Sequence, residues 1–288
     1  MAILSMLFLV ALAVTALPAH VSACTSSLSV NIGASEAAQC AYVFSLDESD
    51  DGTCPTLQEA MCRRLVLQQT QGQDLIAHYA FDNNPTDSTV HHRDGSTTGH
   101  VTYASGRCGK AAVFDGSSKV VVDAFRNHVW GSQFSVSVWF KQTVARIYQG
   151  IVNNGYYTTG SWEVRMGRTN IGQIGGGVVT ADSAVTWNYR DLTATVGQWH
   201  HAAMTYNGSQ LLFYLDNQLQ PGEKACCHGD IIPRNTPLTI GQAGAGTAGN
   251  FFIGLIDEVK IFRKALSADE VGRLSDTPCA SSSICPGA

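Results

Sequence analysis

Short runs in which apolar and polar residues alternate dominate the chain from residue 74 onward. In FSVSVWFK, residues 134–141, every second residue is a large apolar one, which is the period of a β-strand with one face in a core. In WHHAAMTYNGSQLLFYLDN, residues 199–217, two such runs are joined by Asn207-Gly208, a dipeptide that suits the positive φ angles of a hairpin turn. Many short strands separated by turn residues predict an all-β, antiparallel two-sheet sandwich.

The first 23 residues, MAILSMLFLVALAVTALPAHVSA, form an uncharged apolar run that ends in small residues. This pattern predicts a signal peptide over residues 1–23 and a secreted, extracellular mature protein. No later stretch approaches the ~18 consecutive apolar residues that a membrane-spanning helix needs, so no transmembrane segment is expected. A minor alternative is that VSAC marks a bacterial lipoprotein site, in which Cys24 carries a lipid anchor.

The chain has nine cysteines, and in an exported protein they are expected to form disulfides. The pairs Cys54–Cys62 and Cys279–Cys285 are close enough in sequence to be the first candidates. Because nine is odd, one cysteine is left over, and the adjacent pair Cys226-Cys227 is expected to supply it. That cysteine either stays unpaired or joins another chain in a covalent oligomer.

The charge of the chain argues against two classes of partner. Its net charge is −5 at pH 7, and 14% of its residues are charged. The sequence has no basic stripe for nucleic acid and no polybasic patch for a membrane surface. We therefore expect no nucleic-acid partner.

The distribution of cysteines and strand patterns divides the chain into four parts. After the signal peptide, residues 24–72 hold four cysteines and a helix candidate that begins with a capping-box pattern at Thr56. The sandwich is expected over residues 73–275, and a tail with Cys279 and Cys285 over residues 276–288. The fold of the 24–72 segment is not indicated by its sequence.

One acidic residue is out of place in the pattern of the last predicted strand. In FFIGLIDEVKIFRKAL, residues 251–266, strict alternation puts Asp257 on the same face as four apolar residues, Ile253, Leu255, Val259 and Ile261. A buried carboxylate needs a hydrogen-bonding partner, an opposite charge or a metal ion. We therefore expect Asp257 to hold the last strand to a neighbouring loop.

Four segments, taken in order, resemble a laminin-G-like, concanavalin-A-like jelly-roll domain. They are DLIAHYAFDNNPTDSTVHHRDG, GRCGKAAVFDGSSKVVVD, GQWHHAAMTYNGSQLLFYLDN and FIGLIDEVKIFRKALSADEV, and the resemblance covers residues 74–274. It implies two antiparallel sheets packed face to face. It also implies an exported module of the kind that binds glycans or extracellular proteins, often attached to an enzyme.

The resemblance also implies a calcium site, because some members of this family bind Ca²⁺ at the rim of the sandwich. Asp82 and Asp257 would each supply a carboxylate oxygen, and backbone carbonyls of the loop DSTVHHRDG, residues 87–95, would complete the shell. The chain departs from the family at His91 and His92, where Gly and Asn are usual. The alternative without a metal is that Asp257 accepts hydrogen bonds from the loop after the first strand.

Paired carboxylates of the kind that glycoside hydrolases use are missing from the sequence. A retaining enzyme holds two carboxyl groups about 5 Å apart, but no E-x-D-x-x-E pattern occurs, and the adjacent Asp257 and Glu258 point to opposite faces. Glu163 is an isolated acid, expected to pair with Arg165 or Arg168 on the surface. We therefore expect no enzymatic activity, with a glycoside hydrolase as a remote alternative.

Aromatic residues near turns give the best indication of a ligand-binding surface. Sugars stack their apolar faces on aromatic rings, and the candidates are Tyr156, Tyr157, Trp187 and Tyr189. The glycines of NIGQIGGGVVT, residues 170–180, are interpreted as tight turns. Asn207-Gly208-Ser209 is an N-glycosylation sequon at the predicted hairpin tip.

The expected function is non-catalytic binding of a glycan or an extracellular protein in adhesion or matrix, with calcium as a candidate cofactor. The alternative is a structural coat or matrix component that binds only neighbouring subunits. The residues do not identify the ligand, because a fold does not fix a function.

Overall fold

The computed structural model describes residues 24–31, 39–46, 74–167, 170–182, 186–220, 224–225, 227–244 and 250–276. For 24–31, 39–46, 186–191 and 224–225 the description is limited to the backbone. The predicted signal peptide, the Thr56 helix and the pairs Cys54–Cys62 and Cys279–Cys285 lie outside these ranges. They stay predictions, as do the boundaries of the four expected parts.

The chain divides into two compact units, of which residues 72–280 form one. In the other, strand β1, Cys24–Asn31, pairs antiparallel with β2, Gln39–Leu46, from Cys24 opposite Leu46 to Asn31 opposite Gln39. The 24–72 segment therefore contains a β-hairpin that its sequence did not indicate.

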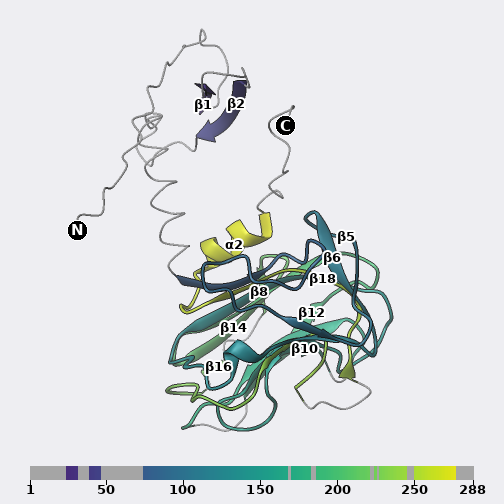
Figure 1. Ribbon diagram of the computed structural model, residues 1–288. Helices are drawn as coiled ribbons and strands as arrows, with labels where there is room; N and C mark the ends of the chain where they lie inside the picture. The colour runs from purple at the N-terminus through teal and green to yellow at the C-terminus, as the bar shows by residue number, and fades with distance from the viewer. Residues whose placement is uncertain are drawn as a thin grey trace, which may run out of the picture. The chain divides into compact units, whose positions relative to one another are not determined.

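The larger unit contains two antiparallel sheets, visible as separate layers in Figure 1. One has nine strands in the order β15-β14-β13-β8-β18-β6-β5, with β16 paired to β14 and β3 paired to β18. Its strands are β3 Leu75–Tyr79, β5 Thr102–Ser105, β6 Lys110–Asp115, β8 Phe134–Gln142, β13 His200–Tyr206, β14 Gln210–Leu215, β15 Gln218–Leu219, β16 Lys224–Ala225 and β18 Ile253–Phe262.

The second sheet has seven strands in the order β12-β11-β10-β9-β17-β7-β4. They are β4 Ser96–Thr98, β7 Lys119–Val122, β9 Gly150–Asn154, β10 Trp162–Met166, β11 Gln173–Val178, β12 Thr186–Thr193 and β17 Leu238–Ile240. A 3₁₀ turn, η1 Asp123–Phe125, follows β7. The predicted all-β, antiparallel jelly-roll sandwich is confirmed.

The core lies between the two sheets and follows the period of two in the strands. In β8, Phe134, Val136, Val138 and Phe140 are all fully buried in it. The predicted hairpin is confirmed, since β13 and β14 pair from Ala202 opposite Leu215 to Tyr206 opposite Leu211. Helix α2, Ala268–Asp276, covers the outer face of the larger sheet, where Val271 packs in a second apolar cluster with Phe262 and Tyr214.

The prediction that Asp257 shares the apolar face of its strand is wrong, because β18 contains a β-bulge. Between Asp257 and Lys260 the strand advances three residues, while its partner β8 advances two, from Trp139 to Ser137. Glu258 takes a left-handed φ of 50° at this point. The extra residue exchanges the two faces of the strand, so the core receives Ile256, Val259 and Ile261.

The described residues contain no helix that is both long and apolar enough to span a bilayer.

Candidate functional site

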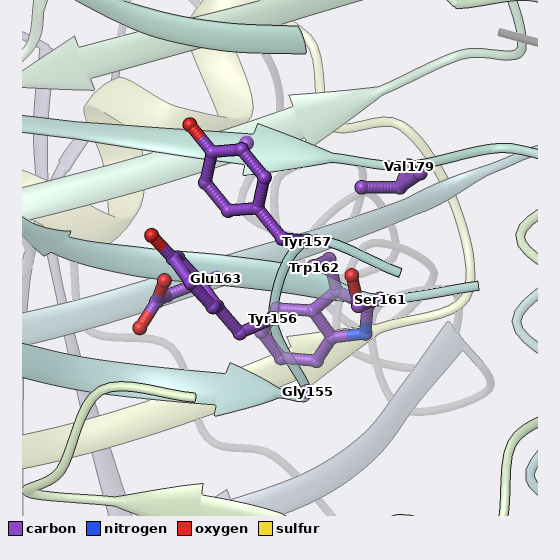
Figure 2. A pocket seen from close by; sticks show the side chains of 8 residues that line it. Gly155, Tyr156, Tyr157, Ser161, Trp162, Glu163 and Val179 are labelled. Carbon is purple, nitrogen blue, oxygen red and sulfur yellow. The ribbon is translucent and has the colours of Figure 1, made fainter. Parts of the chain in front are cut away.

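Loop 155–161, between β9 and β10, forms one wall of a small depression at an end of the smaller sheet. The depression holds about 150 Å³ and is lined by Gly155, Tyr156, Tyr157, Ser161, Trp162, Glu163, Gly177 and Val179 (Figure 2). Enclosed ligand pockets are usually larger, about 300–1,000 Å³. The depression is therefore too shallow to enclose a ligand, and any ligand would have to rest on the surface above it.

Two tyrosine rings stand on this loop. Their centroids are 4.4 Å apart with an angle of 57° between the planes. Tyr156 is half-buried, whereas Tyr157 is 46% exposed and has a left-handed φ of 53°. The structure thus brings together two of the predicted ligand-binding aromatics and leaves one ring open to solvent.

Loop 155–161 is fixed at several points along its length. Gly160 N–H donates to the carbonyl of Val179 at 2.7 Å, and Ser161 N–H donates to Thr158 at 2.9 Å. The Arg234 guanidinium donates through Nη1 to the carbonyl of Thr159 at 2.8 Å. These bonds tie the loop to the end of β11 and to the segment before β17.

Beneath the loop, β10 places a buried acid and a buried base on the face opposite the core. Glu163 is 1% exposed and Arg165 is 2% exposed. Glu163 Oε1 accepts a 2.7 Å bond from the Gly244 N–H, while its Oε2 lies 3.6 Å from Arg165 Nη1 without a hydrogen bond. The predicted pairing of Glu163 with Arg165 is confirmed, but its predicted surface location is wrong, because Tyr156 and Gly244 pack over it.

The environment of Glu163 moves its titration from the acidic range to near neutral pH. Burial raises the pKa of Glu163 to about 7, although Arg165 and the Gly244 N–H act to lower it. The ordinary pKa of a glutamate is near 4.5. An acid whose pKa is raised in the folded state contributes its full stabilisation below pH 4.5. This stabilisation is lost as the pH rises through about 7.

We therefore expect the unfolding free energy to fall between pH 4.5 and pH 7.5, with Glu163 contributing about 3 kcal/mol of the decline. Glu163→Gln resembles the protonated acid, so it should match the wild type at acidic pH and flatten the decline, because an amide does not ionise as the pH rises. Urea unfolding at a series of pH values checks this. Parallel curves for the wild type and the variant would contradict the pKa assignment.

In β11, next to β10, glycines occupy two alternate positions on the face that Glu163 and Arg165 share. Gly177 lies opposite Glu163, and Gly175 lies opposite Arg165. The interpretation of these glycines as turns is wrong, because they lie within β11. Trp187 and Tyr189 of β12 are in turn the register partners of Gly177 and Gly175, so the backbone of β11 runs between the Glu163–Arg165 pair and these two predicted aromatics.

A second group of polar residues surrounds Asp257. Its Oδ2 accepts the N–H groups of Arg107 and Cys108, at 2.8 and 2.9 Å. Its Oδ1 is buried and has no hydrogen-bond partner. Burial raises the pKa of Asp257 to about 7, although the hydrogen bonds from the two backbone N–H groups act to lower it. A Cβ on Gly106 would lie 2.6 Å from Oδ2, so glycine is needed for this close approach.

Asp82 binds the same turn from the other side. Its Oδ1 accepts the Lys110 N–H at 2.7 Å and lies against Gly109, whose φ is 52°. The donors to Asp257 and Asp82 thus belong to the Gly106–Lys110 turn between β5 and β6. The expectation that the loop after the first strand supplies the donors to Asp257 is wrong, because the bulge directs Asp257 to the outer face.

Loop 87–95, which was expected to supply calcium ligands, is organised around Asp87. This residue is 3% exposed and accepts the N–H groups of His78, Thr89 and Arg93 and the Thr89 hydroxyl. His91 and His92 are exposed. Among the described residues, no three His, Cys, Asp or Glu side chains gather as a metal-binding group. The sequence analysis missed Asp87, although Asp87-Ser-Thr is a typical turn-forming sequence.

The sequon lies at the tip of the β13–β14 hairpin, as predicted. Asn207 is exposed, and its Oδ1 accepts the N–H groups of Ser209 and Gln210 at 3.0 and 2.8 Å. These bonds fix the turn and leave the residue on the surface.

Several solved structures share this fold. Domain 4 of AbnA, a GH43 extracellular arabinanase from Geobacillus stearothermophilus solved in complex with arabinotriose, has a TM-score of 0.57 and 24% identity, with 70% of this chain and 98% of that chain covered. The binding domain of Paraclostridial Mosquitocidal Protein 1 has a TM-score of 0.59 and 18% identity, with 72% and 52% covered.

A structure of botulinum neurotoxin type C, whose cell entry depends on two ganglioside molecules, has a TM-score of 0.53 and 13% identity, with 73% and 52% covered. The chain thus spans about half the length of the two toxin chains. Among curated proteins, no sequence matches this one.

A family model matches residues 114–272, more than half of the 288 residues. This stretch runs from β6 to α2 and includes loop 155–161 and Asp257. The chain therefore belongs to the concanavalin A-like lectin/glucanases superfamily.

Proposed function

We propose that this protein is an exported, non-catalytic binding module that recognises a glycan through the surface formed by Tyr156 and Tyr157. The observation that carries the proposal is the 46% exposed Tyr157 ring, which lies in a tilted contact with Tyr156, 4.4 Å between the ring centroids. An exposed ring held in place suits the apolar face of a sugar, and its hydroxyl adds a hydrogen bond. Trp187 and Tyr189, two strands away from β10, are proposed to extend the surface.

Two features favour binding over catalysis. Among the residues that line the depression, Glu163 is the one carboxylate, and glycoside hydrolysis in this kind of fold uses two, about 5 Å apart in a retaining enzyme. The fold neighbours include a domain in complex with arabinotriose and toxin binding domains. Their low identity supports the likeness of the fold alone, so the ligand class is our inference.

Export is supported by the apolar first 23 residues and by the nine cysteines, a number typical of chains that fold in an oxidising compartment. We propose an extracellular role in adhesion or matrix. Attachment through a lipid on Cys24 is the minor alternative.

A glycan array probed with the exported chain tests the proposal. The expected result is binding to a defined subset of glycans. Cooperative unfolding shows that the protein on the array is folded. If such a protein bound no glycan, the proposal would be contradicted, and a coat or matrix component that binds its neighbours would be favoured.

We further propose that Ca²⁺ binds between Asp82 and Asp257. The buried, unpartnered Oδ1 of Asp257 supports this, because an oxygen of that kind fits the ligand preference of calcium. Asp82 supplies a second carboxylate at the same turn. When bound, the ion would supply the positive charge that keeps the buried carboxylate ionised.

Calcium in large excess over its Kd is expected to raise Tm by about 5 °C relative to EDTA. Asp257→Asn keeps an acceptor for the turn but removes the charge, so it should lose most of this increase. Scanning calorimetry checks both proteins. Equal Tm values for the wild type in calcium and in EDTA would contradict the site.

Asn207 is proposed to carry an N-glycan when the chain is made in a host that glycosylates. Its exposed position at a hairpin tip supports access by the transferase. Peptide-N-glycosidase F should then shift the wild type, but not Asn207→Gln, on a gel. The absence of a shift in the wild type would contradict the proposal.

A further inference from the structure

Arg165 is packed against aromatic rings on the outer side of β10. Its guanidinium carbon lies 5.1 Å from the centroid of the Tyr156 ring and 5.5 Å from that of Tyr148. A guanidinium at this distance is attracted to the face of a ring. Since Tyr156 also contacts the exposed Tyr157, a continuous series of contacts runs from the buried base to the solvent-facing ring.

Glu163 holds a backbone segment that packs against Tyr156. Through Oε1 it holds the backbone of Gly244, and a Cβ on Gly244 would meet the carbonyl oxygen of Gly155 and lie 2.9 Å from the Cβ of Tyr156. The Gly244 backbone is thus pressed against loop 155–161. Figure 2 places the Tyr156 ring and the Glu163 carboxylate on the same side of the depression, with the Trp162 indole on the other.

A buried ion pair is a poor source of stability on its own. The desolvation of two charges offsets much of their attraction, and apolar replacements often keep the fold equally stable. The geometry of this pair is also loose for stability, since the two groups are 3.6 Å apart and Glu163 Oε2 makes no hydrogen bond. The contacts that the pair does make are the hydrogen bond of Glu163 with the Gly244 N–H and the approach of Arg165 to the Tyr156 ring.

We propose that Glu163 and Arg165 are positioning residues: without touching the ligand, they set the orientation of the Tyr156 and Tyr157 rings on which it stacks. This inference rests on the proposed function and deepens it. The proposal means that the two rings are preorganised for a flat ligand, rather than free to adopt several orientations until a ligand binds. Such preorganisation raises affinity by reducing the ordering that binding requires.

Two conservative variants test the proposal. Arg165→Lys keeps the charge but loses the planar guanidinium that spans both rings. Glu163→Gln keeps an acceptor for the Gly244 N–H but loses the charge that faces Arg165 when the acid is ionised, so both proteins are compared above pH 7. The matched control is Arg126→Lys, in an exposed ion pair with Asp123. Cooperative urea unfolding establishes that each protein is folded.

The first readout needs no ligand. In aromatic NMR spectra of tyrosine-labelled protein, the ring signals of Tyr156 and Tyr157 are expected to move in both variants and to stay in place in Arg126→Lys, because rings 4.4 Å apart shift one another's signals. The second readout is the glycan array, on which Arg165→Lys should bind about tenfold more weakly than the wild type.

Unchanged tyrosine signals in both folded variants would overturn the proposal whatever the array gives. Moved signals with unchanged glycan affinity would also overturn it, because the ring orientation would then not matter for binding. Moved signals with weakened binding support it. Moved signals with a wild type that binds no glycan support the positioning of the rings and overturn the proposed glycan function instead.

Discussion

Replacing Asp257 by alanine is expected to lower the free energy of unfolding by about 2–4 kcal/mol. The substitution removes the acceptor of two backbone N–H groups, those of Arg107 and Cys108. It also leaves a cavity at a side chain that is 0% exposed, and a partner left without its hydrogen bond costs more than the bond is worth. Urea unfolding in EDTA at pH 7 measures the loss free of any contribution from calcium.

Two further substitutions separate the loss of the hydrogen-bond acceptor from the loss of the charge. Asp257→Asn keeps an acceptor in the same place and removes the charge, so in EDTA it should be at least as stable as the wild type. Asp123→Ala removes an exposed acid that pairs with Arg126, and should change stability by less than about 1 kcal/mol. A loss from Asp257→Ala no larger than that from Asp123→Ala would contradict the role of Asp257 in holding the turn.

Gly150→Ala is expected to cost about 3 kcal/mol or more. A Cβ at Gly150 would collide with the backbone of Gln242 and Ala243, where β9 passes the segment that follows β17. Backbone cannot move aside as the end of a flexible side chain can. Because that segment continues to Gly244, the variant should also disturb the contact between Gly244 and Glu163.

The control for this substitution is Gly131→Ala. Gly131 has a positive φ of 69°, but a Cβ there would meet nothing within 4 Å. It should therefore cost only the ~1–2 kcal/mol of an alanine in a left-handed conformation. Equal losses in the two variants, measured by urea unfolding, would show that the close approach at Gly150 is relaxed at little cost.

Much of the fold was predictable, because local pattern and packing agree in the central strands. The alternation in residues 134–141 determines which face of that strand is buried. The Asn207-Gly208 turn determines the register of the two strands that it joins. The order of the quoted segments then indicated the family.

The bulge at Asp257 was not predictable from alternation. One extra residue in β18 relative to β8 exchanges the inward and outward positions of the residues that follow it. The sequence of the strand does not indicate where this bulge lies. The resemblance did place Asp257 and Asp82 near each other, and both do bind one turn. The sequence carries no sign that this turn is Gly106–Lys110, because its contact with Asp257 joins residues about 150 positions apart.

The candidate site was predictable only in part. Tyr156 and Tyr157 were recognised as neighbouring aromatics, but the environment of Glu163 includes Gly244, which is far along the chain. The glycines of β11 looked like turn residues, since a strand built of glycines lacks the usual β-forming side chains. These glycines lie between the paired residues of β10 and β12, and this position follows from the strand register, which the sequence does not indicate.

Glycan binding by Tyr157→Ala, compared with the wild type on one array, tests the proposed surface most directly. Val90→Ser is the matched control, since Val90 is 86% exposed and lies in loop 87–95, outside the depression. Loss of the exposed ring should weaken binding at least about tenfold, while Val90→Ser binds as the wild type does. Full binding by a folded Tyr157→Ala would contradict the assignment of this surface as the glycan site.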